Sequence, residues 1–473
     1  MEESEKAQAL KTLADGVLRR EKVKRPKKVA SVRVSPGGYL AAASILTFAS
    51  VLLLRSGNDP WALVVLVAAW LVMPALALTD RLVFDGQSLR RRGPLPFFSQ
   101  LISGNRQQLS IADVERVDTS AVRTLRRGGR VRYRYRSQVV GRSLSFVVVS
   151  GGKKYRKMVH SLFLLIPDQK LDARTRELRD YLCEPRLMGS EIASLGLASP
   201  AVLDNAIADL KNRFANRPPL IEDQSAPDLE RARLLRRLAN QLRVAGRLAE
   251  SREAFRRALI VLPWDARLIY EFGRLLRSQA SAMGDARLLL RARAALRLSF
   301  QRADEDGDLL ALIGESQVEC GDIQRAERTL HRALSVDSKN FRARIELADL
   351  ALRNGKLAHV IHHYRDASQT APDKALTLYA RREADYYARL NDDDEYLSAE
   401  LRRIDWLQNA TRVRRLAARV TNASILFALI APYLNSTISG LGWSLASCSL
   451  LAWIGAFSFS RVLADRRKPR PAE

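Results

Sequence analysis

Four uncharged apolar segments, arranged in two adjacent pairs, are the strongest constraint on how this chain of 473 residues folds. Residues 37–54 and 61–78 contain no Asp, Glu, Lys or Arg, and only the hexapeptide RSGNDP separates them. A second pair lies near the C-terminus, at about 421–437 and 441–459, with an uncharged connection. Each segment is close to the ~20 residues that a helix needs to cross a bilayer. The pairing favours two transmembrane hairpins over buried core helices or a cleaved signal peptide.

Basic residues around these segments predict how the hairpins are oriented. The N-terminal 36 residues, the stretch RVRRLAARV before the third segment and the tail after residue 463 are rich in Lys and Arg. The two hairpin tips contain a single basic residue, Arg55. Because basic flanks stay on the cytoplasmic side, we expect both termini and the whole middle of the chain in the cytoplasm, at a bacterial inner membrane. No span contains an ionisable residue, which favours anchoring over transport.

The segment after the first hairpin has the period of short strands. RLVFDGQSLRRRG predicts a strand, a turn at Asp85-Gly86 and a second strand. LSIADVERVDT, RVRYRYR and SLSFVVVSGGKKYRKM follow as further strands, and DARTRELRDYL closes the segment as a helix. The phrases DGQSLRRRG and LSIADVERV resemble the bacterial PH-like domains that often follow membrane hairpins. That resemblance covers about 100 residues and implies a small β-rich barrel.

This strand segment is strongly basic, and its arginines alternate with apolar residues. In RVRYRYR the strand period puts the arginines on one face and Val131, Tyr133 and Tyr135 on the other. Stacking of nucleic-acid bases needs aromatic rings on the basic face, so a membrane of anionic lipid is the favoured partner. A solvated or protein-contacting face is the other explanation. The predicted lipid-surface residues are Arg90, Arg91, Arg92, Arg130, Arg132, Arg134, Arg136, Lys153 and Lys154.

The second half of the chain repeats at close to 34 residues. Ala258, Ser299, Ala333 and Ala367 occupy equivalent places, with seven extra residues in the second repeat. Glycines recur at the turn within a repeat, and Phe255, Leu296, Leu330 and Tyr364 recur at its large apolar position. This pattern resembles tetratricopeptide (TPR) repeats, which implies paired helices stacked into an α-helical solenoid. A generic helical bundle is the alternative. Residues 375–410 look like a degenerate capping pair.

The resemblance also implies a concave groove lined by the first helix of each repeat. The groove would be basic at one end and mixed or acidic at the other, and its arginines could hold an acidic or C-terminal peptide of a partner. A solvated groove is the competing interpretation. The predicted partner-binding residues are Arg233, Arg236, Arg237, Asn240, Arg243, Arg267, Arg274, Arg277, Glu315, Glu319, Asp349 and Arg353, with Asp308, Arg342 and Glu346 on the same face.

Motifs for chemistry are scarce in this sequence. It has no phosphate loop GxxxxGK[ST], no HExxH and no nucleophile elbow, so we expect no catalytic residues, no cofactor and no enzyme activity. His359, His362 and His363 have the spacing of helical metal ligands but lack an adjacent acidic or cysteine ligand, so no metal is expected. Cys183, Cys320 and Cys448 lie far apart, which fits a reducing compartment.

Together these features predict a multi-domain membrane protein. With 78 Lys plus Arg against 51 Asp plus Glu, its net charge of +27 suits anionic partners. We expect a non-enzymatic scaffold or assembly factor; an accessory subunit of a membrane complex and a lipid-sensing module remain open. The expected domains are a basic segment 1–36, hairpins 37–79 and 420–462, a PH-like domain 80–182, a helical linker 183–229, a solenoid 230–410 (repeats 232–265, 266–306, 307–340 and 341–374) and a basic tail 463–473.

Overall fold

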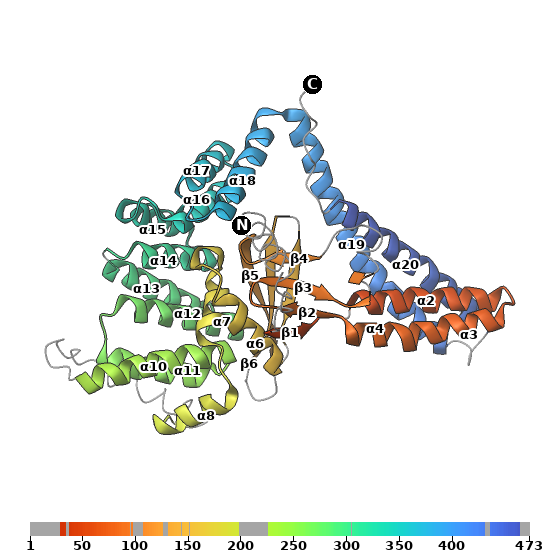
Figure 1. Cartoon of the computed structure of the whole chain (residues 1–473), viewed down its shortest axis with the longest axis horizontal. Coiled ribbons are helices and arrows are strands. Elements are labelled where there is room, and N and C mark those ends of the chain that lie inside the picture. The colour runs from red at the N-terminus through yellow and green to blue at the C-terminus, as the bar shows by residue number, and fades with distance from the viewer. Residues whose placement is uncertain are drawn as a thin grey trace, which may run out of the picture. The chain divides into compact units, whose positions relative to one another are not determined.

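The computed structural model describes residues 29–34, 37–94, 96–97, 107–125, 131–142, 144–150, 152–197, 226–303, 305–430 and 436–463 (Figure 1). The chain divides into two compact units. The first comprises Met1–Ser35, Leu78–Leu350 and Asp366–Tyr379, and the second comprises Pro36–Ala77, Ala351–Arg365 and Ala380–Glu473. The strand segment and most of the repeats therefore form one unit, whereas the sequence suggested separate domains. The basic N-terminal segment before Val29 and residues 198–225 of the expected helical linker 183–229 lie outside the described residues.

Two small antiparallel sheets form the β domain of the first unit. This confirms the β-rich character that the sequence predicts, while the PH-like barrel stays a prediction. One sheet has the order β1 (Ala30–Arg33), β2 (Arg81–Phe84), β3 (Ser88–Arg92) and β4 (Gln108–Ser110). The other has the order β5 (Val114–Leu125), β6 (Val131–Gly141) and β7 (Ser145–Val149). Strand β1 was not expected, because it lies in the basic segment before the first apolar run. It pairs with β2, so the chain leaves and re-enters the first unit at one sheet edge.

Helices complete the core of the β domain. They are α6 (Gly152–Phe163) and, after the 3₁₀ turn η2 (Asp168–Lys170), α7 (Ala173–Tyr181). The next helix, α8 (Pro185–Ser194), packs instead against the first repeat through Met188. Phe84, Val117 and Val139 from the two sheets are completely buried together with Met158 of α6. The expectation of a single closing helix was wrong, because α6 precedes α7. The signal for α6 was present: its buried Tyr155, Met158, Val159 and Leu162 follow the helical period.

The repeats fold as paired helices, which confirms the helical solenoid. The pairs are α10 (Ala226–Ala245) with α11 (Leu248–Val261), α12 (Ala266–Met283) with α13 (Ala286–Arg302), α14 (Gly307–Glu319) with α15 (Ile323–Val336), and α16 (Phe341–Arg353) with α17 (Leu357–Thr370). Within a pair, a small residue faces a large one. A Cβ added to Gly314 would lie 2.6 Å from Leu330 Cδ2, and Leu330 is completely buried. Close approach of the two helices therefore depends on the recurring small residue.

The second unit contains long apolar helices. They are α2 (Gly37–Arg55), a stretch formed by α3 (Asp59–Val67), the π-helical turn η1 (Ala68–Val72) and α4 (Met73–Thr79), and α20 (Ser436–Val462). The π turn accommodates Pro74, which cannot continue a regular α-helix. Among the described residues, Asp59–Thr79 and Leu441–Ser460 are long and apolar enough to cross a membrane, and Ala42–Leu54 is a shorter apolar helix. Transmembrane insertion of all four segments stays a prediction.

One continuous helix replaces two elements that the sequence suggested. After α18 (Lys374–Asp392), helix α19 runs for 37 residues from Asp394 to Ile430. We expected a capping helix that ends near residue 410 and a separate span that begins near 420; this expectation was wrong. The stretch 394–430 contains neither glycine nor proline, so no residue in it favours a helix end. The third apolar segment thus extends the last helix of the array.

We predict that Gly246→Ala will destabilise the first unit more than Gly284→Ala. Gly246 follows α10 and Gly284 follows α12, and both have a positive φ, +83° and +68°. An alanine in this left-handed conformation lowers the free energy of unfolding by about 1 kcal/mol. A Cβ on Gly246 would also lie 2.1 Å from the backbone oxygen of Val131 in β6, whereas Gly284 has nothing within 4 Å. Denaturant unfolding of both full-length variants in detergent measures the difference. Equal shifts of the unfolding midpoint would contradict this contact between the repeats and the β domain.

Candidate functional site

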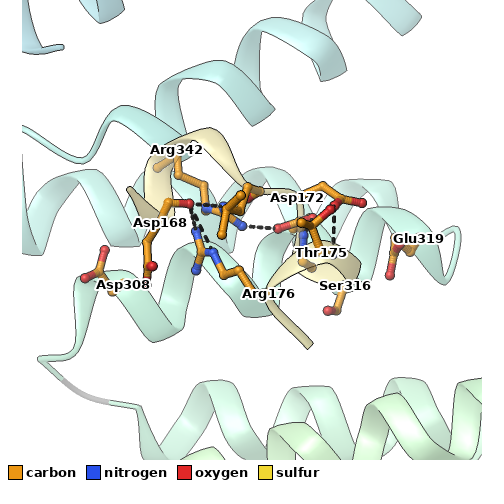
Figure 2. A network of polar contacts seen from close by, with 12 residues as sticks. Asp168, Asp172, Thr175, Arg176, Asp308, Ser316, Glu319 and Arg342 are labelled. Carbon is orange, nitrogen blue, oxygen red and sulfur yellow. Dashed lines mark hydrogen bonds and ion pairs between the residues drawn. The ribbon is translucent and has the colours of Figure 1, made fainter. Parts of the chain in front are cut away.

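The inner face of the repeats is partly covered by a segment of the β domain, α7 with the preceding turn η2 (Figure 1). Polar residues fix the start of α7 to the sheet. The Asp172 carboxylate accepts a hydrogen bond from the Thr175 amide (2.8 Å), which caps the helix. The Thr175 hydroxyl lies 2.7 Å from the Thr119 hydroxyl in β5, and both side chains are buried. The start of α7 is therefore fixed to β5, and Figure 2 shows Asp172 and Thr175 side by side at this point.

Glu177 of α7 carries the central contact with the repeats. Its carboxylate accepts a hydrogen bond from Nη1 of Arg243 in α10 (2.9 Å) and forms an ion pair with Nε of Arg274 in α12. The three side chains are only 14 %, 6 % and 4 % exposed, respectively. Burial on its own would raise the pKa of Glu177, but the two guanidinium groups outweigh it and lower the pKa to about 2. Glu177 is thus ionised at every physiological pH.

A second carboxylate, Glu271 of α12, joins the first two repeats to the end of α7. It accepts hydrogen bonds from Nε and Nη2 of Arg236, both at 2.7 Å, and from Nδ2 of Asn240 at 2.8 Å. The Tyr181 hydroxyl at the end of α7 donates to the same carboxylate over 3.2 Å. The bidentate geometry is that of a strong arginine–carboxylate pair. Two of the predicted groove residues therefore hold a carboxylate of the neighbouring repeat.

The third contact lies further along the array, around Arg342 of α16 (Figure 2). Its Nη1 donates to Glu315 of α14 over 2.6 Å, and its Nη2 donates to the backbone oxygen of Leu171. Glu315 accepts from the amide of Ala173, the first residue of α7, over 3.1 Å. Lys170 of η2, which is buried, pairs with Asp373 at 2.8 Å. These bonds tie η2 and α7 to the third and fourth repeats.

Apolar packing reinforces the polar contacts. Val131 of β6 is buried in one cluster with Leu242 of α10 and Phe255 of α11. Val244 of α10 is buried in the core of the β domain, and its backbone oxygen accepts a 2.6 Å hydrogen bond from the Tyr135 hydroxyl. Two hydrophobic clusters thus each contain residues of both the β domain and the repeats. The β domain and the first repeats form one packed body.

The predicted groove residues divide into buried and exposed groups. Buried or half-buried and bonded within the chain are Arg236, Asn240, Arg243, Arg274, Arg277 and Glu315. Arg233, Arg237, Arg267 and Asp308 are exposed, and Glu319, exposed as a residue, pairs with Arg277. Asp349 lines a cavity with Arg116 and Glu346, and Arg353 is exposed in the second unit. Sequence reasoning missed Glu177 and Glu271, because no local pattern shows which distant arginine a helical glutamate will meet.

The predicted lipid-surface residues are mostly exposed. Arg132, Arg134 and Arg136 share the exposed face of β6, opposite the buried Val131 and Tyr135, as the strand period requires. Arg92, Lys153 and Lys154 are also exposed, and Arg90 pairs with Asp85 at 3.4 Å. Arg91 differs, because it forms an ion pair at 2.5 Å with Asp80, which is completely buried. Arg130 lies outside the described residues.

The structure places no recognisable metal centre in the part of the chain that it describes. No group of three or more His, Cys, Asp or Glu there is arranged to hold a metal ion. His362 and His363 have ring centroids 5.5 Å apart on α17. The three cysteines are free. The residues that come together are instead arginines and carboxylates, which suit binding and positioning.

We predict that Glu177→Gln will destabilise the first unit by about 3 kcal/mol, because it removes the carboxylate shared by two buried guanidinium groups and leaves Arg274 only its longer, 3.8 Å pair with Glu319. Asp180→Asn is the matched control. Asp180 lies on the same helix and pairs with Arg179 at 2.7 Å, but its side chain is 43 % exposed, so its loss should cost less than about 1 kcal/mol. Chemical denaturation of both full-length variants at pH 7 measures the two costs. A similar loss of unfolding free energy in the two variants would contradict the stabilising role of the Glu177 ion pairs.

A second prediction concerns Glu346 of α16, which lines a cavity with Glu315 and Asp349. Burial, Glu315 and Asp349 raise the pKa of Glu346 to about 8, above its ordinary value of 4.5. The stability that the protonated form contributes is therefore complete below pH 4.5 and is lost as the pH rises through about 8. Glu346→Gln should raise the melting temperature at pH 9 and change it little at pH 5. The control Glu327→Gln, at an exposed position of α15, should change the melting temperature equally at pH 5 and pH 9. If both variants show the same pH dependence, the raised pKa of Glu346 is refuted.

Comparison with known proteins places this chain in no established family. No family model and no curated protein matches it. The crystal structure of the MamA protein is similar at 15 % identity, with 36 % of this chain and 95 % of that chain covered and a TM-score of 0.27. The crystal structure of the APC/C hetero-tetramer Cut9-Hcn1 is similar at 11 % identity, with 66 % and 52 % covered and a TM-score of 0.29. The repeat architecture is therefore read from helices α10 to α17 themselves.

Proposed function

We propose that this protein is a membrane-anchored, non-enzymatic scaffold that binds a protein partner on the uncovered part of its repeat array. The observation that carries the proposal is the docking of α7 through the buried Glu177. It makes the β domain and the repeats one rigid body, and it leaves only part of the inner face open. Rigid presentation lowers the entropy cost of binding a partner.

The open part of the inner face is a groove of about 680 Å³ along repeats two to four. Its lining includes the exposed Arg267, Asp308 and Lys339, the half-buried Leu312, and Arg176 from α7. This volume is within the range of ligand pockets. Four aspartates and four basic residues line this groove, so its charge is mixed. Arg267 and Lys339 lie beside Leu312, where each side chain can pair with a carboxylate of an acidic or C-terminal peptide. We therefore assign partner binding to this open groove rather than to the arginines that α7 covers.

Membrane anchoring by the two hairpins is the second element of the proposal. Large apolar side chains of the second unit are exposed, among them Trp61 (66 %), Leu71 (70 %) and Leu441 (67 %), and soluble proteins rarely gather such exposure. The pairing of β1 with β2 supports a hairpin whose two ends lie on the same side of the membrane. With the basic flanks, this favours a cytoplasmic location of the first unit at a bacterial inner membrane.

Affinity purification of the tagged full-length protein in mild detergent tests this function. The decisive variant is R267E/K339E in the open groove, and the matched control is R328E/R332E, which makes the same charge change at exposed positions of α15. We expect a stoichiometric protein partner that is reduced at least about tenfold in the first variant, because two charged contacts are reversed, and kept in the control.

The other outcomes contradict parts of the proposal. A partner that both variants retain would refute binding in the open groove and favour an accessory subunit held through the hairpins. The absence of any stoichiometric partner would refute the scaffold. That result would shift the proposal to the exposed basic face of β6, with Arg132, Arg134 and Arg136, as a sensor of anionic lipid.

A further inference from the structure

A small cavity in the first unit lies where the β domain, α7 and the first two repeats meet. Its volume is about 120 Å³. Five arginines line it: Arg123 of β5, Arg174 of α7, Arg243 of α10, and Arg274 and Arg277 of α12. Glu177 is the one carboxylate in its described lining. The cavity is separate from the open groove, with which it shares no lining residue.

The charges around this cavity do not balance. Glu177 is shared between Arg243 and Arg274, and Glu319, outside the lining, pairs with Arg277. Arg123 donates a 3.2 Å hydrogen bond to the neutral Ser281 hydroxyl. Five guanidinium groups, which stay protonated at any physiological pH, thus face two carboxylates. Arg243 and Arg274 are buried, Arg174 and Arg277 are half-buried, and Arg123 is exposed at the rim. Such an excess of positive charge in a confined site favours the binding of an anion.

Two further observations support an anion site among these arginines. The Nε of Arg243 is buried and has no hydrogen-bond partner among the described residues. Burial lowers the pKa of Arg277, and the charges of Arg274 and Arg174 act in the same direction against that of Glu319. Both features are expected of a site built to receive a negative charge. Tyr133, beside Arg123, Arg174 and Arg243, offers a further hydroxyl donor.

The size and the donors define the ligand. A volume of about 120 Å³ corresponds to about four waters at about 30 Å³ each, which is enough for a tetrahedral oxyanion with four oxygens. Guanidinium forks bind phosphate oxygens in pairs. We propose that this cavity binds a phosphate group, either as orthophosphate or as the phosphate end of a small phosphomonoester. The bound anion would link α7, α10 and α12 and so strengthen the packing of the β domain on the repeats.

The test is isothermal titration of inorganic phosphate into the full-length protein in detergent, dialysed against chloride at constant ionic strength. We expect saturable binding of one phosphate per chain. Arg174→Gln should weaken it at least about tenfold, because a charged hydrogen bond contributes about 1.5 kcal/mol or more. Arg277→Gln should act in the same way. Arg233→Gln, which removes the same charge from an exposed position of α10, should change the affinity less than about twofold.

A melting curve for each variant confirms folding, and phosphate should raise the wild-type melting temperature more than that of Arg174→Gln. Phenyl phosphate distinguishes the two sources of the anion: binding tighter than that of orthophosphate assigns a phosphomonoester, and loss of binding assigns the free ion. The proposal is overturned if phosphate binds no better than chloride, or if the Arg233 and Arg174 variants weaken binding equally.

Discussion

The buried ion pairs of Glu177 with Arg243 and Arg274 determine how the described first unit is organised. The three residues come from α7, α10 and α12, that is, from the β domain and from two repeats. A single buried charge is costly, and a compensated set is tolerated only when its geometry is maintained. Separating α7 from the repeats would therefore break the ion pairs of Glu177 with Arg243 and Arg274 together. The apolar clusters that contain Val131 and Val244 act in the same direction.

This docking changes what the repeat array can offer a partner. Superhelical arrays expose a concave surface along the first helices, but here Arg236 and Asn240 hold Glu271, and Arg342 holds Glu315 and the backbone before α7. Most of the basic end is therefore used to position parts of the same chain. The surface left open lies along Arg267 and Lys339, where side chains are exposed and can exchange water for a ligand.

Charge is also distributed unevenly along the inner face. Near α10 and α12, arginines outnumber carboxylates, and the pKa of Glu177 is lowered to about 2. Near α14 and α16, burial and the neighbouring Glu315 and Asp349 raise the pKa of Glu346 to about 8. Burial raises the pKa of both carboxyl groups, but two arginines reverse this effect at Glu177, whereas Glu315 and Asp349 add to it at Glu346. Helix α7 thus lies between a basic and an acidic region, and the basic region contains the cavity for which we propose an anion.

The sequence by itself determined the elements and their periods. Uncharged runs, two-residue alternation in RVRYRYR and the recurrence of Phe255, Leu296 and Leu330 are local properties, and each corresponds to a helix or strand in the structure. Even the missed helix α6 and the unbroken α19 had local signals. Only the tertiary structure decided what fills the groove. Glu177 and Arg243 are 66 positions apart in the chain, and no local pattern specifies their pairing, because it depends on how the β domain packs on the repeats.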